Sequence, residues 1–148
     1  KLGLMLHDPE EEHDCFSDNT HNSHYYDIAG MLAVWAGKYR RVDGSTVSGP
    51  SLAALVRQVD APLAAEMSAK LAATLSKAAI MKKRAETKEA YDQMLGRDNP
   101  EGNAVVDAVV EALKAQTKVI EKIVAKLKLK PIEIEGSDSL DDPAKVFK

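Results

Sequence analysis

Two long stretches of the sequence repeat apolar side chains every three or four residues. The first begins at Asp60 and runs toward Met81, and the second begins at Asn99 and runs to Leu127. Residues three and four apart lie on one face of an α-helix, so both stretches predict long helices with one buried side. Asp60 and Asn99 each stand one or two residues before a proline, which is typical of a helix start. These two faces have to pack against other helices.

A third helical pattern runs from Tyr25 to Tyr39 and gives way to glycines and a proline. We expect residues 37–50 to form the longest internal loop, and Pro50 to open a short helix that ends near Asp60. Aromatic residues make up only 5% of the chain, and alanine is frequent, which favours helix packing over a sheet sandwich. The predicted fold class is all-α, a bundle of about four helices.

The length of 148 residues predicts one domain. We assign residues 1–130 to the bundle and residues 131–148 to an extended acidic tail that contains glycine and proline. Within the bundle, residues 1–6 resemble the last turns of a helix that begins upstream, and residues 7–20 form a polar segment.

Charge and composition exclude several classes of protein. The net charge of -3 gives no basic surface for nucleic acid, so we expect no nucleic-acid partner. The only cysteine, Cys15, has no second cysteine for an internal disulfide. No apolar run is long enough to predict a membrane span, and the first residues do not resemble a signal peptide.

The stretch "EEEHDCFSDNTHNSH", residues 10–24, contains three of the four histidines and the only cysteine. The pairs Glu10/His13 and His21/His24 are spaced three apart, which places two metal ligands on one helix face. Two interpretations stay open, a metal or polar-ligand site and a hydrogen-bonded helix junction. Cys15 suits a nucleophile or a soft metal ligand, but a buried, inert cysteine beside Phe16 is the commoner outcome.

The residues just before the third helical pattern have side chains that cap helices. Asp18, Asn19 and Thr20 are therefore predicted to be its N-terminal capping group. On the last helix four lysines recur at steps of four, which indicates a solvated face, with an anion or partner site as the alternative. These are Lys114, Lys118, Lys122 and Lys126.

Two motifs resemble the second half of the imelysin family, which includes insulin-cleaving membrane protease and iron-regulated protein A. They are "EEEHDCFSDNTH" and, one helix later, "YRRVDGSTVSGPSLAALV". The resemblance implies a bacterial protein of the periplasm, outer membrane or cell envelope, often lipid-anchored on its upstream part. It also implies two helical bundles with a polar site at their junction, and as partner an N-terminal half that carries the family motif GxHxxE, which is absent from this sequence.

The resemblance implies a set of site residues. Those expected to bind are Glu12, His13, Asp18, Asn19 and His21, and of these Glu12, His13 and His21 are the expected ligands of a divalent metal or iron. Ser23 stands where the family commonly has an acidic residue. The leading hypothesis is metal binding or uptake, related to iron. The alternatives are a metal-dependent peptidase, to which His13 or His21 contributes a proton donor, and a purely structural docking bundle.

Overall fold

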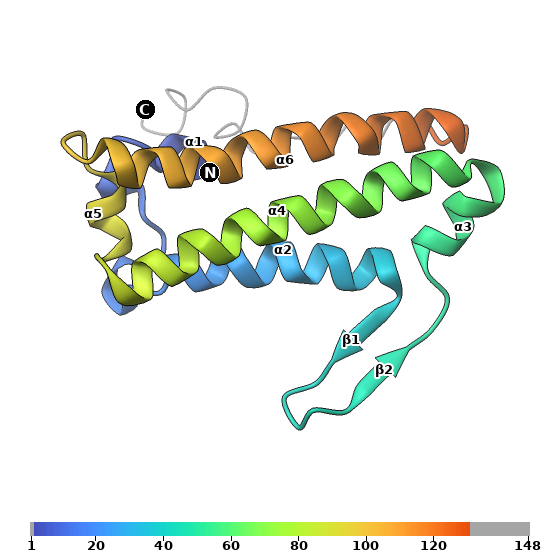
Figure 1. Ribbon diagram of the computed structural model, residues 1–148, viewed down its shortest axis with the longest axis horizontal. Helices are drawn as coiled ribbons and strands as arrows, with labels where there is room; N and C mark the ends of the chain where they lie inside the picture. The colour runs from blue at the N-terminus through green and yellow to red at the C-terminus, as the bar shows by residue number, and fades with distance from the viewer. Residues whose placement is uncertain (1, 131–148) are drawn as a thin grey trace.

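The computed structural model describes residues 2–130, and Figure 1 shows their arrangement. Three long helices lie side by side: α2 (Thr20–Ala36), α4 (Ala61–Thr87) and α6 (Pro100–Lys126). The shorter elements are α1 (Leu2–Met5), the 3-10 turns η1 (Pro9–Glu11) and η2 (Cys15–Ser17), the strands β1 (Lys38–Arg40) and β2 (Thr46–Ser48), α3 (Leu52–Val59) and α5 (Tyr91–Leu95). The all-α bundle is confirmed.

Helix α4 lies between α2 and α6 and runs antiparallel to both (Figure 1). Its start is fixed by Asp60, whose side chain accepts a hydrogen bond from the backbone N–H of Leu63 at 3.0 Å. Asn99 caps α6 in the same way, by accepting from the N–H of Gly102 at 2.9 Å. Both starts agree with the sequence prediction, because a polar cap before a proline satisfies backbone donors that the first turn leaves open.

The core consists of two apolar clusters at opposite ends of the bundle. One gathers around Met81, Tyr91 and Val106, with Leu2 and Met5 of α1 closing it. The other gathers around Trp35, Val56 and Ile123. The four aligned lysines of α6 lie outside both clusters, and Lys114, Lys122 and Lys126 form ion pairs with Glu111, Glu66 and Asp60. This agrees with a solvated face.

Residues 37–50 differ from the predicted loop. They contain an antiparallel hairpin in which Tyr39 lies opposite Val47, and α3 begins at Leu52 with Ser51 as its cap, so Pro50 precedes the helix. Each strand has only three residues, too few for an alternating pattern to be recognised among glycines and serines.

No helix among residues 2–130 is long and apolar enough to cross a membrane. The predicted acidic tail, residues 131–148, lies outside the described residues.

Candidate functional site

The polar segment folds against the end of the bundle where α5 and the start of α2 meet (Figure 1). Its chain direction is set by tight turns: Asp18 adopts the left-handed conformation, with φ 48°, and ends η2. Thr20 holds the segment onto α2, because its hydroxyl oxygen accepts from the backbone N–H of Asp14 at 3.1 Å. These turns place Glu12 and the first two turns of α2 beside α5.

Four side chains at this end have buried polar atoms without a hydrogen-bond partner among the described residues. The atoms are Glu12 Oε1, His21 Nδ1, His24 Nε2 and Tyr91 Oη. Glu12 is 6% exposed, His21 7% and Tyr91 0%, so these groups have left water. Burying such a group unpaired costs about 1–3 kcal/mol, which makes several of them at one place unusual for a purely structural contact.

Tyr91 lies at the centre of this group, which we call the Tyr91 cluster (Glu12, His21, His24 and Tyr91). The centroid of its ring lies 6.5 Å from that of His21 and 6.2 Å from that of His24. Burial raises the pKa of the Tyr91 hydroxyl above its usual value, and the nearby charge of Glu12 raises it further. Tyr91 is therefore a neutral hydroxyl that can donate one hydrogen bond.

His24 is also neutral near pH 7. Burial, and after it the nearby His13, lower its pKa from 6.5 to about 4, against the opposing effects of Asp27 and Asp14. The rings of His13 and His24 meet edge to face, with centroids 5.1 Å apart. A neutral imidazole keeps a lone pair on one nitrogen, so His24 can bind a cation or accept a proton.

The ring of His21 is oriented by Asn22, which is not a member of the cluster. Asn22 donates its side-chain N–H to His21 Nε2 at 3.1 Å and to Asn19 Oδ1 at 2.9 Å. Because Nε2 accepts, a ring proton lies on Nδ1, which is buried without a partner among the described residues. The cluster thus presents two donors, from His21 and Tyr91, beside the carboxylate of Glu12.

Two hollows border the cluster. One, of about 490 Å³, is lined by His24, His13 and apolar side chains that include Leu2 and Leu113. The other, of about 340 Å³, is lined by Glu12, Cys15 and Asp18. A small ligand or a side chain of a partner can therefore approach both Glu12 and His24.

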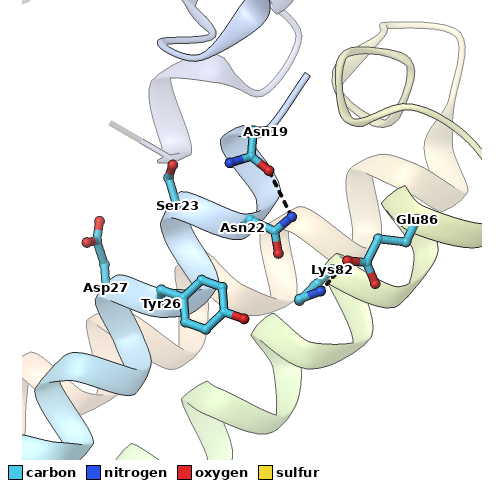
Figure 2. Close-up of a pocket in the computed structure, with 7 residues that line it drawn as sticks. All are labelled: Asn19, Asn22, Ser23, Tyr26, Asp27, Lys82 and Glu86. Carbon is cyan, nitrogen blue, oxygen red and sulfur yellow. Dashed lines mark hydrogen bonds and ion pairs between the residues drawn. The ribbon is translucent and has the colours of Figure 1, made fainter. Parts of the chain in front are cut away.

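A third hollow, of about 580 Å³, lies between the first turns of α2 and the end of α4, and Figure 2 shows its lining residues. Its polar groups are largely paired with one another: Asn22 donates to Asn19, and Lys82 pairs with Glu86. Ser23 donates to Asp14. We therefore regard the Tyr91 cluster, and not this hollow, as the candidate site.

The structure separates the five residues expected to bind. Glu12 and His21 are buried and belong to the Tyr91 cluster. His13 is partly exposed and lies 3.4 Å from a carboxylate oxygen of Asp14. Asp18 and Asn19 are exposed. Among residues 2–130, no three histidine, cysteine or acidic side chains are grouped closely enough to hold a metal ion, so Glu12, His13 and His21 do not form one ligand set.

Two structural predictions for the segment are wrong. Asn19 stands at the cap position of α2, but no side chain caps the helix, because Asn19 Oδ1 accepts from the Asn22 amide and the Thr20 oxygen from Asp14. Cys15 and Phe16 are exposed, not buried, because the tight turn of η2 directs both outward.

Tyr91 is the member of the cluster that sequence reasoning missed. It comes from α5, far along the chain from the histidines, and its neighbours Met94 and Leu95 are apolar core residues. Its spacing from them indicates only a helix, so the sequence holds no signal that Tyr91 meets His21 and His24.

Comparisons with known proteins bear on this site. A family model described as Imelysin, peptidase family M75, matches residues 1–120, which include the whole Tyr91 cluster. A search among curated proteins found no match.

Proposed function

The chain belongs to the imelysin family, and from this premise we propose that it binds a metal ion, iron or a divalent cation, through the Tyr91 cluster. The observation that carries the proposal is the set of buried, unpaired polar atoms on Glu12, His21, His24 and Tyr91. Burying these atoms unpaired lowers the stability of the fold. This cost is expected if a ligand or a partner pairs with them when the protein functions.

The donor chemistry suits such an ion. A carboxylate and neutral imidazoles are the ligands that divalent iron and zinc take in proteins. Glu12 provides the carboxylate, and the low pKa of His24, about 4, keeps its imidazole free of a proton at neutral pH. His21 is not a third ligand beside them, because no three histidine, cysteine or acidic side chains among residues 2–130 are grouped closely enough to hold a metal ion. Its Nε2 accepts from Asn22, and its Nδ1–H can donate to a ligand oxygen.

Residues 2–130 hold no complete ligand set, so the chain would supply part of one. We propose that the rest comes from the N-terminal half of the protein, through the family motif GxHxxE, when it packs over Glu12 and His24. In this arrangement Tyr91 donates its O–H to a ligand oxygen. The N-terminal half fills the two hollows beside the cluster, which then form the junction between the two halves. We also propose that the protein acts in the bacterial cell envelope, which is the location that the family resemblance implies.

The test is metal binding by the intact protein with both halves present. Iron(II) and zinc(II) are titrated against wild type, Glu12→Gln and, as a matched control, Glu11→Gln, which removes a more exposed carboxylate one residue away. We expect Glu12→Gln to weaken binding by about ten- to a hundredfold, while Glu11→Gln leaves it unchanged. Thermal unfolding of each variant without metal separates affinity from stability.

Two outcomes would overturn the proposal. If Glu12→Gln and His24→Gln change stability but not affinity, the cluster serves only to join the two halves. If the intact protein hydrolyses peptides in the presence of metal and His21→Gln abolishes this without weakening binding, the site is that of a peptidase.

A further inference from the structure

His21 is the member of the Tyr91 cluster whose chemistry depends on a residue outside the cluster. A neutral histidine carries its proton either on Nδ1 or on Nε2, so each nitrogen either donates a hydrogen bond or offers a lone pair. The ring is only 7% exposed, so protein groups and not bulk water select between the two forms. Within residues 2–130, its one hydrogen bond joins Nε2 to Asn22 Nδ2 at 3.1 Å.

The direction of this hydrogen bond depends on how the Asn22 amide is turned, because its nitrogen donates and its oxygen accepts. Asn22 Nδ2 also lies 2.9 Å from Oδ1 of Asn19, a carbonyl oxygen that can only accept. The end of α4 lies beside it (Figure 2), where Glu86 pairs with Lys82. The pKa of the Glu86 carboxyl is lowered chiefly by Lys82, and a hydrogen bond from Asn22 lowers it further. The amide nitrogen therefore has acceptors around it, and the turned amide would place its oxygen against them.

The polar hollow of Figure 2 thus supports the Tyr91 cluster from outside. With the Asn22 amide held by Asn19 and Glu86, Nε2 of His21 can only accept, and the ring proton stays on Nδ1. In the other form, the N–H groups of Asn22 and His21 would point at each other, which is repulsive. Nδ1–H is then a buried donor without a partner among the described residues.

We propose that Asn22 is a positioning residue of the Tyr91 cluster: it holds His21 in the form protonated on Nδ1, so that His21 donates a hydrogen bond and does not coordinate the metal. This inference rests on the proposed function and adds the chemistry that the ligand has to provide. His21 and Tyr91 together offer two donors, which fit an oxygen acceptor such as a carboxylate beside the ion. Without such an acceptor both donors would stay buried and unpaired.

Nitrogen-15 NMR of the histidine rings in the metal-free full chain tests the proposal. At pH 8, above the ordinary histidine pKa of about 6.5, long-range proton–nitrogen correlations distinguish a protonated ring nitrogen from one with a lone pair. We expect His21 to be protonated on Nδ1. In Asn22→Asp a carboxylate replaces the donor, so Nε2 should take the proton and the two nitrogen shifts should exchange. A carboxylate in the first turn of α2 is favourable for the helix, so this variant should fold.

The exposed His7 is the internal reference, and its ring signals should be the same in both proteins. A wild-type His21 protonated on Nε2 would overturn the proposal. A His21 that keeps its proton on Nδ1 in Asn22→Asp would overturn it too, because another group would then select the form. These measurements contain no metal, so their outcome is independent of whether the proposed function holds.

Metal affinity of the intact protein, with both halves present, tests the consequence for binding. Zinc(II) is titrated against wild type and Asn22→Asp, with and without acetate as the carboxylate probe. The added negative charge alone would strengthen binding of a cation, whereas loss of the Nδ1–H donor should weaken it about tenfold. Acetate should raise the affinity of wild type more than that of the variant.

Unchanged or higher zinc affinity in Asn22→Asp would overturn the positioning role. An equal effect of acetate on both proteins would overturn the assigned ligand chemistry. If wild type itself binds no zinc and no iron, the proposed function fails, and the NMR measurement still decides whether Asn22 selects the form of His21.

Discussion

The two ends of the bundle treat a buried polar aromatic residue in opposite ways. At one end Trp35 donates its indole N–H to Ser68 Oγ at 2.9 Å, and Ser68 donates in turn to the backbone oxygen of Ala64 at 2.9 Å. At the other end the hydroxyl of Tyr91 is fully buried and has no partner among the described residues.

This difference indicates a structural role for the Trp35 end and a functional role for the Tyr91 end. The Trp35 end uses each of these polar groups to complete its own fold, so nothing further is needed there. The Tyr91 end keeps donors and a carboxylate unused, at a cost to stability of about 1–3 kcal/mol for each unpaired group. Such a cost is expected where a protein reserves groups for a ligand or a partner.

The largest expected effect comes from the Trp35 end. Trp35→Ala should lower the free energy of unfolding by about 3–5 kcal/mol, because it removes a large side chain from a close-packed cluster with Val56 and Ile123. Denaturant unfolding followed by circular dichroism measures it. Val34→Ala, at an exposed position one residue away, is the control. Equal effects of the two substitutions would contradict the assigned core.

Smaller changes in stability should distinguish Trp35, whose N–H is paired, from Tyr91, whose hydroxyl is not. Ser68→Ala leaves the Trp35 N–H buried without an acceptor and should cost about 1–3 kcal/mol. Tyr91→Phe removes a buried hydroxyl that has no partner, so it should leave stability unchanged or raise it by up to about 1–3 kcal/mol. Both are read from the same unfolding titration. A substantial loss on Tyr91→Phe in the metal-free protein would mean that the hydroxyl is already paired, and the comparison between the ends would fail.

Acid should weaken the Tyr91 end through His24. Its pKa is about 4 in the fold and 6.5 when unperturbed, so the unfolded chain takes up the proton first. This contribution to stability is complete above about pH 6.5 and is lost as the pH falls from 6.5 to about 4. The free energy of unfolding is measured for wild type and for His24→Gln across this pH range. The difference between the two isolates the contribution of His24 from that of the titrating carboxylates. A difference that does not vary with pH would rule out the buried neutral form.

The smallest effect concerns an ion pair at the Trp35 end. Lys126 lies 3.0 Å from Asp60, but both side chains are partly exposed to solvent, where water and salt screen the pair. Lys126→Ala should therefore leave the unfolding midpoint within experimental error, at low and at high salt. A clear loss would show that the Trp35 end also depends on charge, and the difference between the two ends would then be smaller.

Much of the fold followed from the sequence, but its shortest elements did not. The starts of α4 and α6 were predictable because Asp60 and Asn99 cap their helices locally, before any packing is known. The hairpin of residues 38–48 was not, since cross-strand pairing decides it and three-residue strands carry too little pattern. Cys15 was predicted to be buried from the habits of cysteine in general, and a local turn directed it outward instead.

Sequence motifs were enough to select the polar segment and the imelysin family. Of the residues predicted to bind, the structure brings Glu12 and His21 into the Tyr91 cluster. Local chemistry, helical periodicity and capping act over a few residues, so the sequence by itself determined the three long helices and the family. Only the tertiary structure decided that Tyr91 lies near both His21 and His24, and that Asp18 and Asn19 remain at the surface. The reason is physical: which buried atoms find partners depends on groups distant in the chain, and these meet only when the helices pack.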